Sequence, residues 1–321
     1  MRIEGSGFGE SGAYVHLPML ASPALVPALG NASPPLMGPQ VPARALISPT
    51  ILLFDSGLGG LTVFREAARA RPDAHFIYVA DDALFPYGAV EESRLIERVL
   101  GLMDGFVAAH QPDLVIIACN TASTLVLPAL RRRFDLPFVG TVPAIKPACA
   151  ASLTKRVSVL GTQATVKREY THALIRQYGA GCRVTLVGSA QLAGFAERQL
   201  AGDPIDDAAL RAEIAPCFVA DGGARTDTVV LACTHYPLLT ERFLRLAPWP
   251  VRWIDPAPAI ARRVVDLVGP PAPDCGANLP QLVFTSGRKP ARILALALQN
   301  FGFGSSAVDG IGAFDTPVIS P

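Results

Sequence analysis

Short apolar runs, separated by segments long enough for helices, constrain what this chain can fold into. They are TILLF (50–54), HFIYVA (75–80), DLVIIA (113–118), LPFVG (136–140), RVSVLG (156–161), RVTLVG (183–188), TVVLA (228–232), VRWID (251–255) and QLVFT (281–285). The runs are continuously apolar rather than alternating, which is typical of strands buried on both faces of a parallel sheet. The sequence therefore predicts an α/β fold with parallel-type sheets flanked by helices.

Two of these runs belong to segments of nearly the same sequence. DLVIIACNTAST (113–124) and DTVVLACTHYPL (227–238) align when Cys119 is laid on Cys233, a shift of 233 − 119 = 114 residues. Each copy is an aspartate, an apolar run, an alanine, a cysteine and small polar residues. The same thiol is therefore expected at the ends of two buried strands.

A second pair of segments repeats at a similar shift. ILLFDSGLGGLTVF (51–64) and VSVLGTQATVKREY (157–170) are related by 157 − 51 = 106 residues. The similar shifts predict two pseudo-symmetric domains. Ligands of parallel sheets bind outside the carboxyl ends of the strands, where DSG, CNT and CTH all fall. We therefore expect the active site in the cleft between the domains.

Composition narrows the class of protein. The 321 residues, half of them apolar, suffice for two domains with large cores. The formal net charge of +1 gives no basic surplus for nucleic acid, so we expect no such partner. Prolines interrupt the N-terminal apolar segment HLPMLASPALVPAL, and no other stretch has membrane-spanning length. That segment also lacks the features of a signal peptide, so we expect a cytoplasmic protein without a membrane segment.

The cysteines do not form a recognisable framework. There are six, widely spread and without a C-x-x-C pair, which favours neither structural disulfides nor a zinc site. They are Cys119, Cys149, Cys182, Cys217, Cys233 and Cys275.

Neither end of the chain shows the apolar periodicity that is typical of a helix or strand packed in a core. Residues 1–48 are rich in Pro, Gly, Ala and Ser, which predicts a disordered or variable extension. A similar composition predicts a flexible tail over 301–321.

The glycine-rich segment FDSGLGGLT (54–62) connects a strand to a helix. Such a loop commonly presents backbone N–H groups to an anion. Its glycine spacing matches neither the phosphate-binding loop nor the dinucleotide fingerprint. A tight turn, with Asp55 or Ser56 bonded to nearby backbone, is the alternative interpretation.

The repeated thiols are the strongest candidates for chemistry. Cys119 and Cys233 each follow a strand and precede a helix, and a helix N-terminus lowers a thiol pKa from about 8.5. His235 could tune the second thiol or relay its proton. Cap candidates follow both cysteines: Asn120, Thr121 and Ser123 in the first copy, Thr234 in the second. Taken singly, either cysteine could be a core residue, but the repetition favours chemistry.

Two matched acid/base groups in one cleft suit a racemase. The enzyme must remove a proton from one face of a carbon and return one to the other, from either enantiomer. Modest tuning brings a thiol pKa near neutral pH, so that one cysteine can be thiolate while the other is thiol.

Five motifs in this order, FDSGLGGLTV, FPYG, ACNTAS, VLGTQAT and ACTHYPLL, resemble the glutamate racemase family over about residues 50–270. The resemblance implies interconversion of L- and D-glutamate without pyridoxal phosphate or metal, and supply of D-glutamate for peptidoglycan, the bacterial cell wall and cell shape. A small-molecule substrate is the implied partner, and a homodimer is a candidate assembly. The chain departs from the family at Asp82 and Leu84, where a small hydroxyl residue and an arginine are usual.

The resemblance also implies a domain division and residue roles. Residues 49–146 plus 255–300 would form racemase domain 1, and residues 147–254 racemase domain 2. Cys119 would act on D-glutamate and Cys233 on L-glutamate. Assisting catalytic residues would be Asp55, His235 and, as the acid supporting the histidine, Glu197. Substrate contacts would come from Asp55, Ser56, Tyr87, Gly88, Asn120, Thr121, Thr234 and His235.

Three other functions remain open. A racemase of the same superfamily could act on aspartate or a hydantoin. A hydrolase with a Cys–His pair would use one cysteine and leave the other idle. A non-catalytic module could use the same loops only to bind carboxylates.

Overall fold

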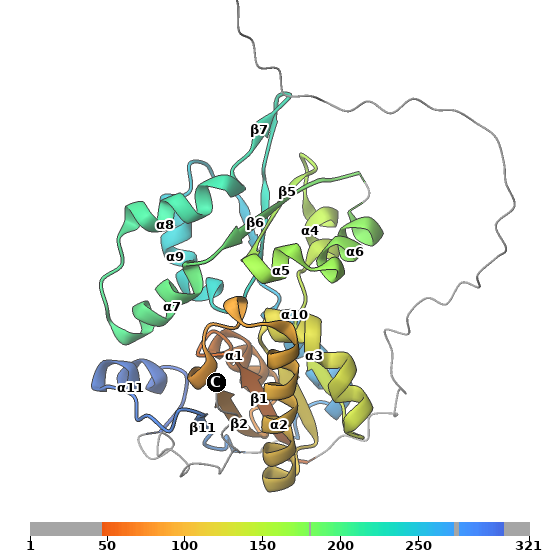
Figure 1. The fold of residues 1–321 in the computed structure, drawn as a ribbon, viewed down its shortest axis with the longest axis vertical. Helices are drawn as coiled ribbons and strands as arrows, with labels where there is room; N and C mark the ends of the chain where they lie inside the picture. The colour runs from red at the N-terminus through yellow and green to blue at the C-terminus, as the bar shows by residue number, and fades with distance from the viewer. Residues whose placement is uncertain (1–46, 180, 273–275, 305–321) are drawn as a thin grey trace, which may run out of the picture. The chain divides into compact units, whose positions relative to one another are not determined.

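The computed structural model describes residues 47–179, 181–272 and 276–304 and contains two parallel sheets with helices around them (Figure 1). All nine predicted apolar runs form strands, and the predicted fold class is confirmed. Most of the predicted N-terminal extension, most of the predicted tail and Cys275 lie outside the described residues.

The first sheet, here the β1 sheet, has five parallel strands in the order β11-β2-β1-β3-β4. Its strands are β1 (Thr50–Asp55), β2 (His75–Ala80), β3 (Leu114–Ile117), β4 (Phe138–Gly140) and β11 (Gln281–Phe284). Around it lie α1 (Leu61–Ala70), α2 (Glu92–His110), α3 (Asn120–Arg133), α10 (Ala257–Val268) and α11 (Arg292–Gln299).

The second sheet, here the β5 sheet, has four parallel strands in the order β10-β9-β5-β6. Its strands are β5 (Arg156–Thr162), β6 (Arg183–Ser189), β9 (Thr228–Ala232) and β10 (Arg252–Ile254). The accompanying helices are α4 (Ile145–Ala151), α5 (Gln163–Lys167), α6 (Glu169–Tyr178), α7 (Leu192–Ala201), α8 (Asp207–Ile214) and α9 (Thr240–Leu246).

The two sheets share one topology, as the internal repeat predicts. The order β2-β1-β3-β4 in the first corresponds to β6-β5-β9-β10 in the second. Cys119 follows β3 and Cys233 follows β9, so the repeated thiols occupy equivalent positions in the two sheets.

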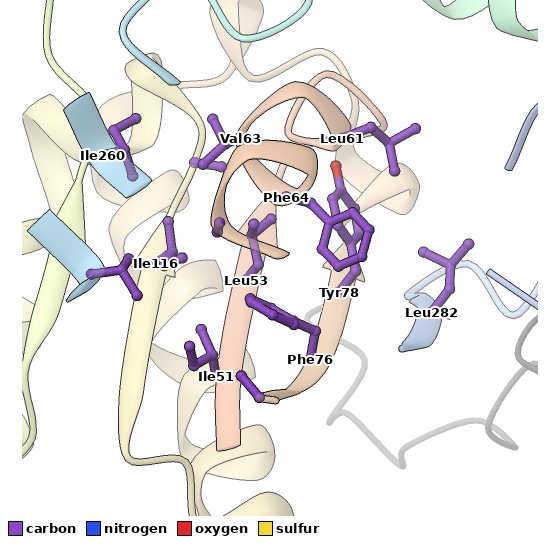
Figure 2. Packing of buried hydrophobic residues seen from close by; sticks show 14 of the residues in the cluster. Ile51, Leu53, Leu61, Val63, Phe64, Phe76, Tyr78, Ile116, Ile260 and Leu282 are labelled. Carbon is purple, nitrogen blue, oxygen red and sulfur yellow. The ribbon is translucent and has the colours of Figure 1, made fainter. Parts of the chain in front are cut away.

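Both faces of the β1 sheet are covered, which explains its continuously apolar strands. Along β1, Ile51 and Leu53 join the core beside α1 and α10, whereas Leu52 and Phe54 join the core beside α2 and α3. Figure 2 shows the first of these clusters, in which Phe64 of α1 packs over the strands. The β5 sheet repeats the pattern, with alternate residues of β9 in two clusters.

The aspartate at the beginning of each repeated segment accepts hydrogen bonds from backbone N–H groups at or just before the start of a neighbouring strand. Asp113 accepts a hydrogen bond from the backbone N–H of Thr50 at 2.8 Å. Its counterpart Asp227 accepts from the backbone N–H groups of Leu153 and Thr154, at 2.7 and 2.9 Å, just before β5. The aspartate of each copy thus serves strand alignment, while the cysteine lies at the opposite end.

Three features differ from the sequence predictions or add to them. A short antiparallel hairpin joins β7 (Ala220–Asp221) and β8 (Ala224–Arg225) through Gly222 and Gly223, both with positive φ. Phe303 is buried against Phe64, so packing continues beyond the predicted start of the tail. Single-turn 3₁₀ segments are Asp82–Leu84, Tyr87–Ala89, Ala215–Cys217 and Tyr236–Leu239. Within the described ranges, no helix has the length and apolarity needed to cross a membrane.

Candidate active site

The candidate site collects side chains from the carboxyl ends of strands in both sheets. β1 leads into Asp55 and Ser56, β3 into Cys119, and β9 into Cys233. Both thiols are buried, with 6 % of each residue exposed. Hydrogen bonds between the β1–α1 loop and the β9 segment hold these strand ends together.

The glycine-rich loop contacts the protein's own side chains. The amide of Leu58 donates to Oε1 of Glu197 at 2.6 Å, and the amide of Gly59 lies 3.2 Å from Nε2 of His235. A Cβ on Gly59 would overlap the His235 ring, and one on Gly57 would lie 2.5 Å from Glu197 Oε1. The glycines are therefore required by the close approach of an imidazole and a carboxylate.

His235 is fixed between a carboxylate and a thiol. Its Nε2 lies 2.9 Å from Glu197 Oε1 and its Nδ1 lies 3.9 Å from Cys233 Sγ. The ring of Phe85 packs beside it at 5.4 Å between centroids. Burial opposes charge on the imidazole, but the bonds to Cys233 and Glu197 outweigh burial and raise the pKa of His235 well above its usual value.

The roles of Nε2 depend on that protonation. When Nε2 carries a proton it donates to Glu197, and it can accept from the Gly59 amide only when it carries none. The raised pKa favours the first arrangement, an imidazolium beside Cys233. That positive charge would attract a thiolate at Cys233.

Asp55 is fully buried at the end of β1. Its Oδ2 accepts the Gly60 amide at 2.8 Å, and its Oδ1 lies 3.5 Å from the hydroxyl of Thr234. Burial raises the pKa of Asp55, although the neighbouring His235 acts in the opposite direction. Asp55 is therefore a carboxyl group that bridges the two sheets and would gain from a cationic ligand.

The predicted lowering of the Cys119 pKa is wrong in this structure. Burial, reinforced by the charge of Asp55, raises the pKa of Cys119 to about 12. The Ala122 amide and the Ser56 side chain act in the opposite direction but do not prevail. The helix N-terminus effect is smaller here than the cost of charging a buried thiol beside a carboxylate.

The predicted helix caps are also absent. Neither Cys119 at the start of α3 nor His235 at the start of the Tyr236–Leu239 turn has a side-chain cap. Ser123 instead donates to the carbonyl of Ile117 at 2.7 Å and accepts the amide of Thr141 at 3.1 Å. Pro237 lies in the first turn of the Tyr236–Leu239 segment, where its missing N–H costs nothing.

Asn120 is the most informative polar residue of the site. It is 2 % exposed, and neither Nδ2 nor Oδ1 has a hydrogen-bond partner among the described residues. Buried amides are nearly always paired, because an unpaired one costs free energy. This amide, next to Cys119 in the chain, can donate to and accept from a ligand.

Thr121 joins the two sheets through hydroxyl groups. Its Oγ1 lies 3.1 Å from that of Thr162 and 3.4 Å from that of Thr165. The two latter hydroxyls are 2.9 Å apart. Thr162 and Thr165 belong to the VLGTQAT motif, the repeat counterpart of the DSG loop, but no role was predicted for them.

Tyr87 and Gly88 border this hydroxyl cluster. A Cβ on Gly88 would lie 3.4 Å from Cβ of Thr162. The hydroxyl of Tyr87 donates to Asp81 at 2.6 Å. Sequence reasoning missed Asp81, although its position directly after β2, at the same sheet edge as Asp55, was a usable signal.

A cavity of about 490 Å³ lies elsewhere. It is lined by Glu92, Thr124, Ala164, Lys167, Arg168, Glu169 and Tyr170. None of the predicted site residues lines it.

Comparison with a family model and with curated proteins identifies relatives. Residues 56–264 match the model described as Asp/Glu/Hydantoin racemase. Glutamate racemase of Brucella ovis is 51 % identical over 265 residues, covering 81 % of this chain and 96 % of the relative. The Brucella anthropi protein of the same name is 52 % identical over 254 residues, covering 78 % and 91 %.

Solved structures agree with these sequence relatives. Escherichia coli glutamate racemase, in complex with L-glutamate and the activator UDP-MurNAc-Ala, superposes with a TM-score of 0.73 at 41 % identity, covering 79 % of this chain and 96 % of that one. The Thermus thermophilus glutamate racemase, in complex with β-chloro-D-alanine, gives a TM-score of 0.62 at 28 % identity, covering 78 % and 93 %.

Proposed function

The chain belongs to the Asp/Glu/hydantoin racemase family of isomerases, and we propose that it interconverts L- and D-glutamate through Cys119 and Cys233 without a cofactor. The observation that carries this proposal is the placement of one buried thiol at equivalent strand ends of two matched sheets. The thiols lie close enough that charge on Cys233 would disfavour charge on Cys119. A two-base racemase needs such a pair.

The surroundings of the two thiols differ. Cys119, whose pKa is about 12, is a protonated thiol at neutral pH. Cys233 Sγ lies 3.9 Å from Nδ1 of the buried His235. The family resemblance assigns the base for L-glutamate to Cys233, so Cys119 is the acid in that direction.

Racemisation of L-glutamate then follows in one proton relay. The Cys233 thiolate takes the α-proton, and the electron pair of the broken C–H bond stays on the α-carbon. The Cys119 thiol donates its proton to the opposite face, which leaves D-glutamate, a Cys119 thiolate and a Cys233 thiol. The reverse reaction starts from that last state, so both thiols change charge in every turnover.

The remaining residues would bind the substrate. A substrate ammonium beside Asp55 would add a second cation to the neighbouring His235 and would ease charging of Cys119. The unpaired amide of Asn120 would bond a carboxylate. Further contacts are proposed from Ser56, Tyr87, Gly88, Thr121, Thr234 and His235. Glutamate as the substrate is supported by the relatives and by the L-glutamate complex of the Escherichia coli protein.

The domain division and biological role belong to the same proposal. Racemase domain 1 would comprise residues 49–146 plus 255–300, and racemase domain 2 residues 147–254. Membership of β11 in the β1 sheet and of β10 in the β5 sheet supports this division. We propose D-glutamate supply for peptidoglycan from the family resemblance and a cytoplasmic location from the sequence, with a homodimer as a candidate assembly.

Exchange of the substrate's α-hydrogen in heavy water tests the function. The purified protein should place deuterium at the α-carbon of both L- and D-glutamate and bring either enantiomer to a racemic mixture. Aspartate and a hydantoin should give far slower exchange. Labelling of aspartate or a hydantoin instead would identify another racemase, hydrolysis without exchange would indicate a hydrolase, and binding alone would indicate an anion-binding module.

Replacing Asn120 provides a sharper test of substrate binding. Asn120→Leu keeps the side-chain shape but removes two buried polar atoms that lack partners. The free energy of unfolding without ligand should therefore rise by about 1 kcal/mol, while glutamate binding and turnover are lost. Ser123→Ala is the matched control, because it removes a paired hydroxyl on the same helix and should lower stability instead. Unchanged kinetics in Asn120→Leu would contradict substrate binding by this amide.

A further inference from the structure

Asp81 forms a buried hydrogen-bonding centre beside the candidate site. It follows β2, and its amide donates to the carbonyl of Asp55 at 2.8 Å. Its carboxylate is fully buried. Oδ2 accepts the Tyr87 hydroxyl at 2.6 Å, and Oδ1 accepts the Thr285 hydroxyl at 2.5 Å. Both oxygens are thus bonded to side chains from other elements.

Arg98 completes the arrangement with two parallel hydrogen bonds. Its Nη2 donates to Oδ1 at 2.6 Å and its Nε donates to Oδ2 at 3.1 Å. Such a bidentate guanidinium–carboxylate pair fixes orientation as well as charge. The pair matters here because an uncompensated carboxylate at this depth would be costly. Asp81 is therefore held rigidly by α2 and by the end of β11.

Through its hydrogen bond to Tyr87, Asp81 anchors the 3₁₀ segment that is proposed to contact the substrate. Tyr87 and Gly88 begin the single-turn helix Tyr87–Ala89, and no residue of that turn has another side-chain hydrogen bond in the described structure. Gly88 packs on Thr162, which shares its hydroxyl contacts with Thr121. Loss of the Tyr87–Asp81 bond would free this turn to move relative to Thr121 and Thr162.

We infer that Asp81, held by Arg98 and Thr285, is a positioning residue that fixes the Tyr87–Gly88 turn for substrate binding. The inference rests on the proposed function, because it concerns binding of glutamate. Asp81 contacts neither thiol, so its effect falls on the binding of both enantiomers and not on proton transfer. The residue on which it acts is Tyr87.

Steady-state kinetics with L- and D-glutamate test this inference. Asp81→Asn and Tyr87→Phe should each raise KM about tenfold in both directions, the cost of about one hydrogen bond, with kcat within about twofold of wild type. The equilibrium constant between enantiomers is one, so kcat/KM must fall equally in both directions. The double variant should resemble Tyr87→Phe alone, because both substitutions break the same link.

Matched controls separate positioning from folding. Asp82→Asn removes the adjacent carboxylate, which binds Ser286 and Arg288 and does not touch Tyr87, and should leave KM unchanged. The Thr285 hydroxyl donates to Asp81 at 2.5 Å and accepts the Ala83 amide only at 3.4 Å, so its main link to Tyr87 runs through Asp81. Thr285→Val should therefore raise KM, whereas Thr285→Ser should not. These Thr285 variants decide the matter if Asp81→Asn fails to fold.

The results that would overturn this inference differ from the result that would overturn the proposed function. If Thr285→Val and Asp81→Asn lower the melting temperature but keep the wild-type KM, Asp81 is structural. Additive increases in KM in the double variant would also refute action through Tyr87. If the wild-type protein itself does not racemise glutamate, the proposed function fails and this inference falls with it.

Discussion

Glu197 Oε1 lies 2.9 Å from His235 Nε2 and, through the same oxygen, accepts the amide of Leu58 at 2.6 Å. One carboxylate from α7 therefore binds the imidazole next to Cys233 and the glycine-rich loop that follows β1. Glu197 therefore contributes to the position of the loop and, together with Cys233, to the raised pKa of the imidazole.

Glu197→Gln should lower the pKa of His235. The substitution keeps an oxygen for the Leu58 amide but removes the negative charge that favours the imidazolium. A raised folded pKa contributes stability that is present below the unfolded value, about 6.5, and lost as pH rises through the folded pKa. The stability difference from wild type should therefore be largest below about pH 6.5 and shrink as pH rises.

Titration of His235 by NMR and urea unfolding at several pH values measure these effects. Glu213→Gln is the control, because Glu213 binds Ser189 and Gln191 and contacts no atom of His235 in the described structure. An unchanged His235 titration in Glu197→Gln would contradict the assigned electrostatic role.

Gly59→Ala should abolish turnover while the protein still folds. The new Cβ would overlap the His235 ring and push it away from Cys233. Gly101→Ala is the matched control, since nothing lies within 4 Å of its Cβ position in α2. That substitution should raise the free energy of unfolding by about 0.5 to 1 kcal/mol with normal kinetics. Racemisation by Gly59→Ala at the wild-type rate would show that the position of His235 is not critical.

Asp227→Asn should remove a pH-dependent part of the stability. Burial acts in the opposite direction, but hydrogen bonds from Thr154, Ser152, Thr228 and Leu153 lower the pKa of Asp227 to about 2. This stability is present above the unfolded value of 3.8 and is lost as pH falls through about 2. The variant should lose about 1 to 2 kcal/mol near pH 7, allowing for partial solvent screening.

Denaturant unfolding between pH 2 and pH 7 checks this expectation. Asp113→Asn, the repeat counterpart, should lose less because that carboxylate accepts a single backbone amide. A constant difference between Asp227→Asn and wild type across this pH range would contradict the linkage.

Sequence patterns predicted the sheets well because strands that are buried on both faces are recognisable as continuous apolar runs in the sequence. In TVVLA (228–232), every residue after Thr228 is apolar, because alternate side chains enter different cores. The β7–β8 hairpin was not predictable in this way, because strands of two residues are too short to show a periodic pattern. Its only signal was the Gly222–Gly223 pair, which is typical of tight hairpin turns.

The site was predictable where the sequence repeats and not where it depends on distant contacts. Cys119 and Cys233 stood out because packing alone does not require the same thiol twice. The position of Asp81 directly after β2 was a signal, but its bond to Thr285, 204 residues away, cannot be predicted from local sequence. The pKa of Cys119 was mispredicted because a helix N-terminus is a local feature, whereas burial and the charge of Asp55 are properties of the fold.

The central claim is that each thiol works on one face of the substrate. With 3-chloroglutamate, abstraction of the α-proton expels chloride, so no proton need be returned to the opposite face. Chloride release by single-cysteine variants therefore reports one base at a time. Circular dichroism of each variant would check that the fold is retained.

Chloride release from the two enantiomers of 3-chloroglutamate by Cys119→Ser and Cys233→Ser is the most direct test. Both variants should lose racemisation, because a serine hydroxyl is a poor acid or base at neutral pH. Cys119→Ser should still release chloride from the L-type substrate through Cys233, and Cys233→Ser from the D-type substrate through Cys119. Near-normal racemisation by either variant, or loss of chloride release from every isomer by folded variants, would contradict the two-thiol account.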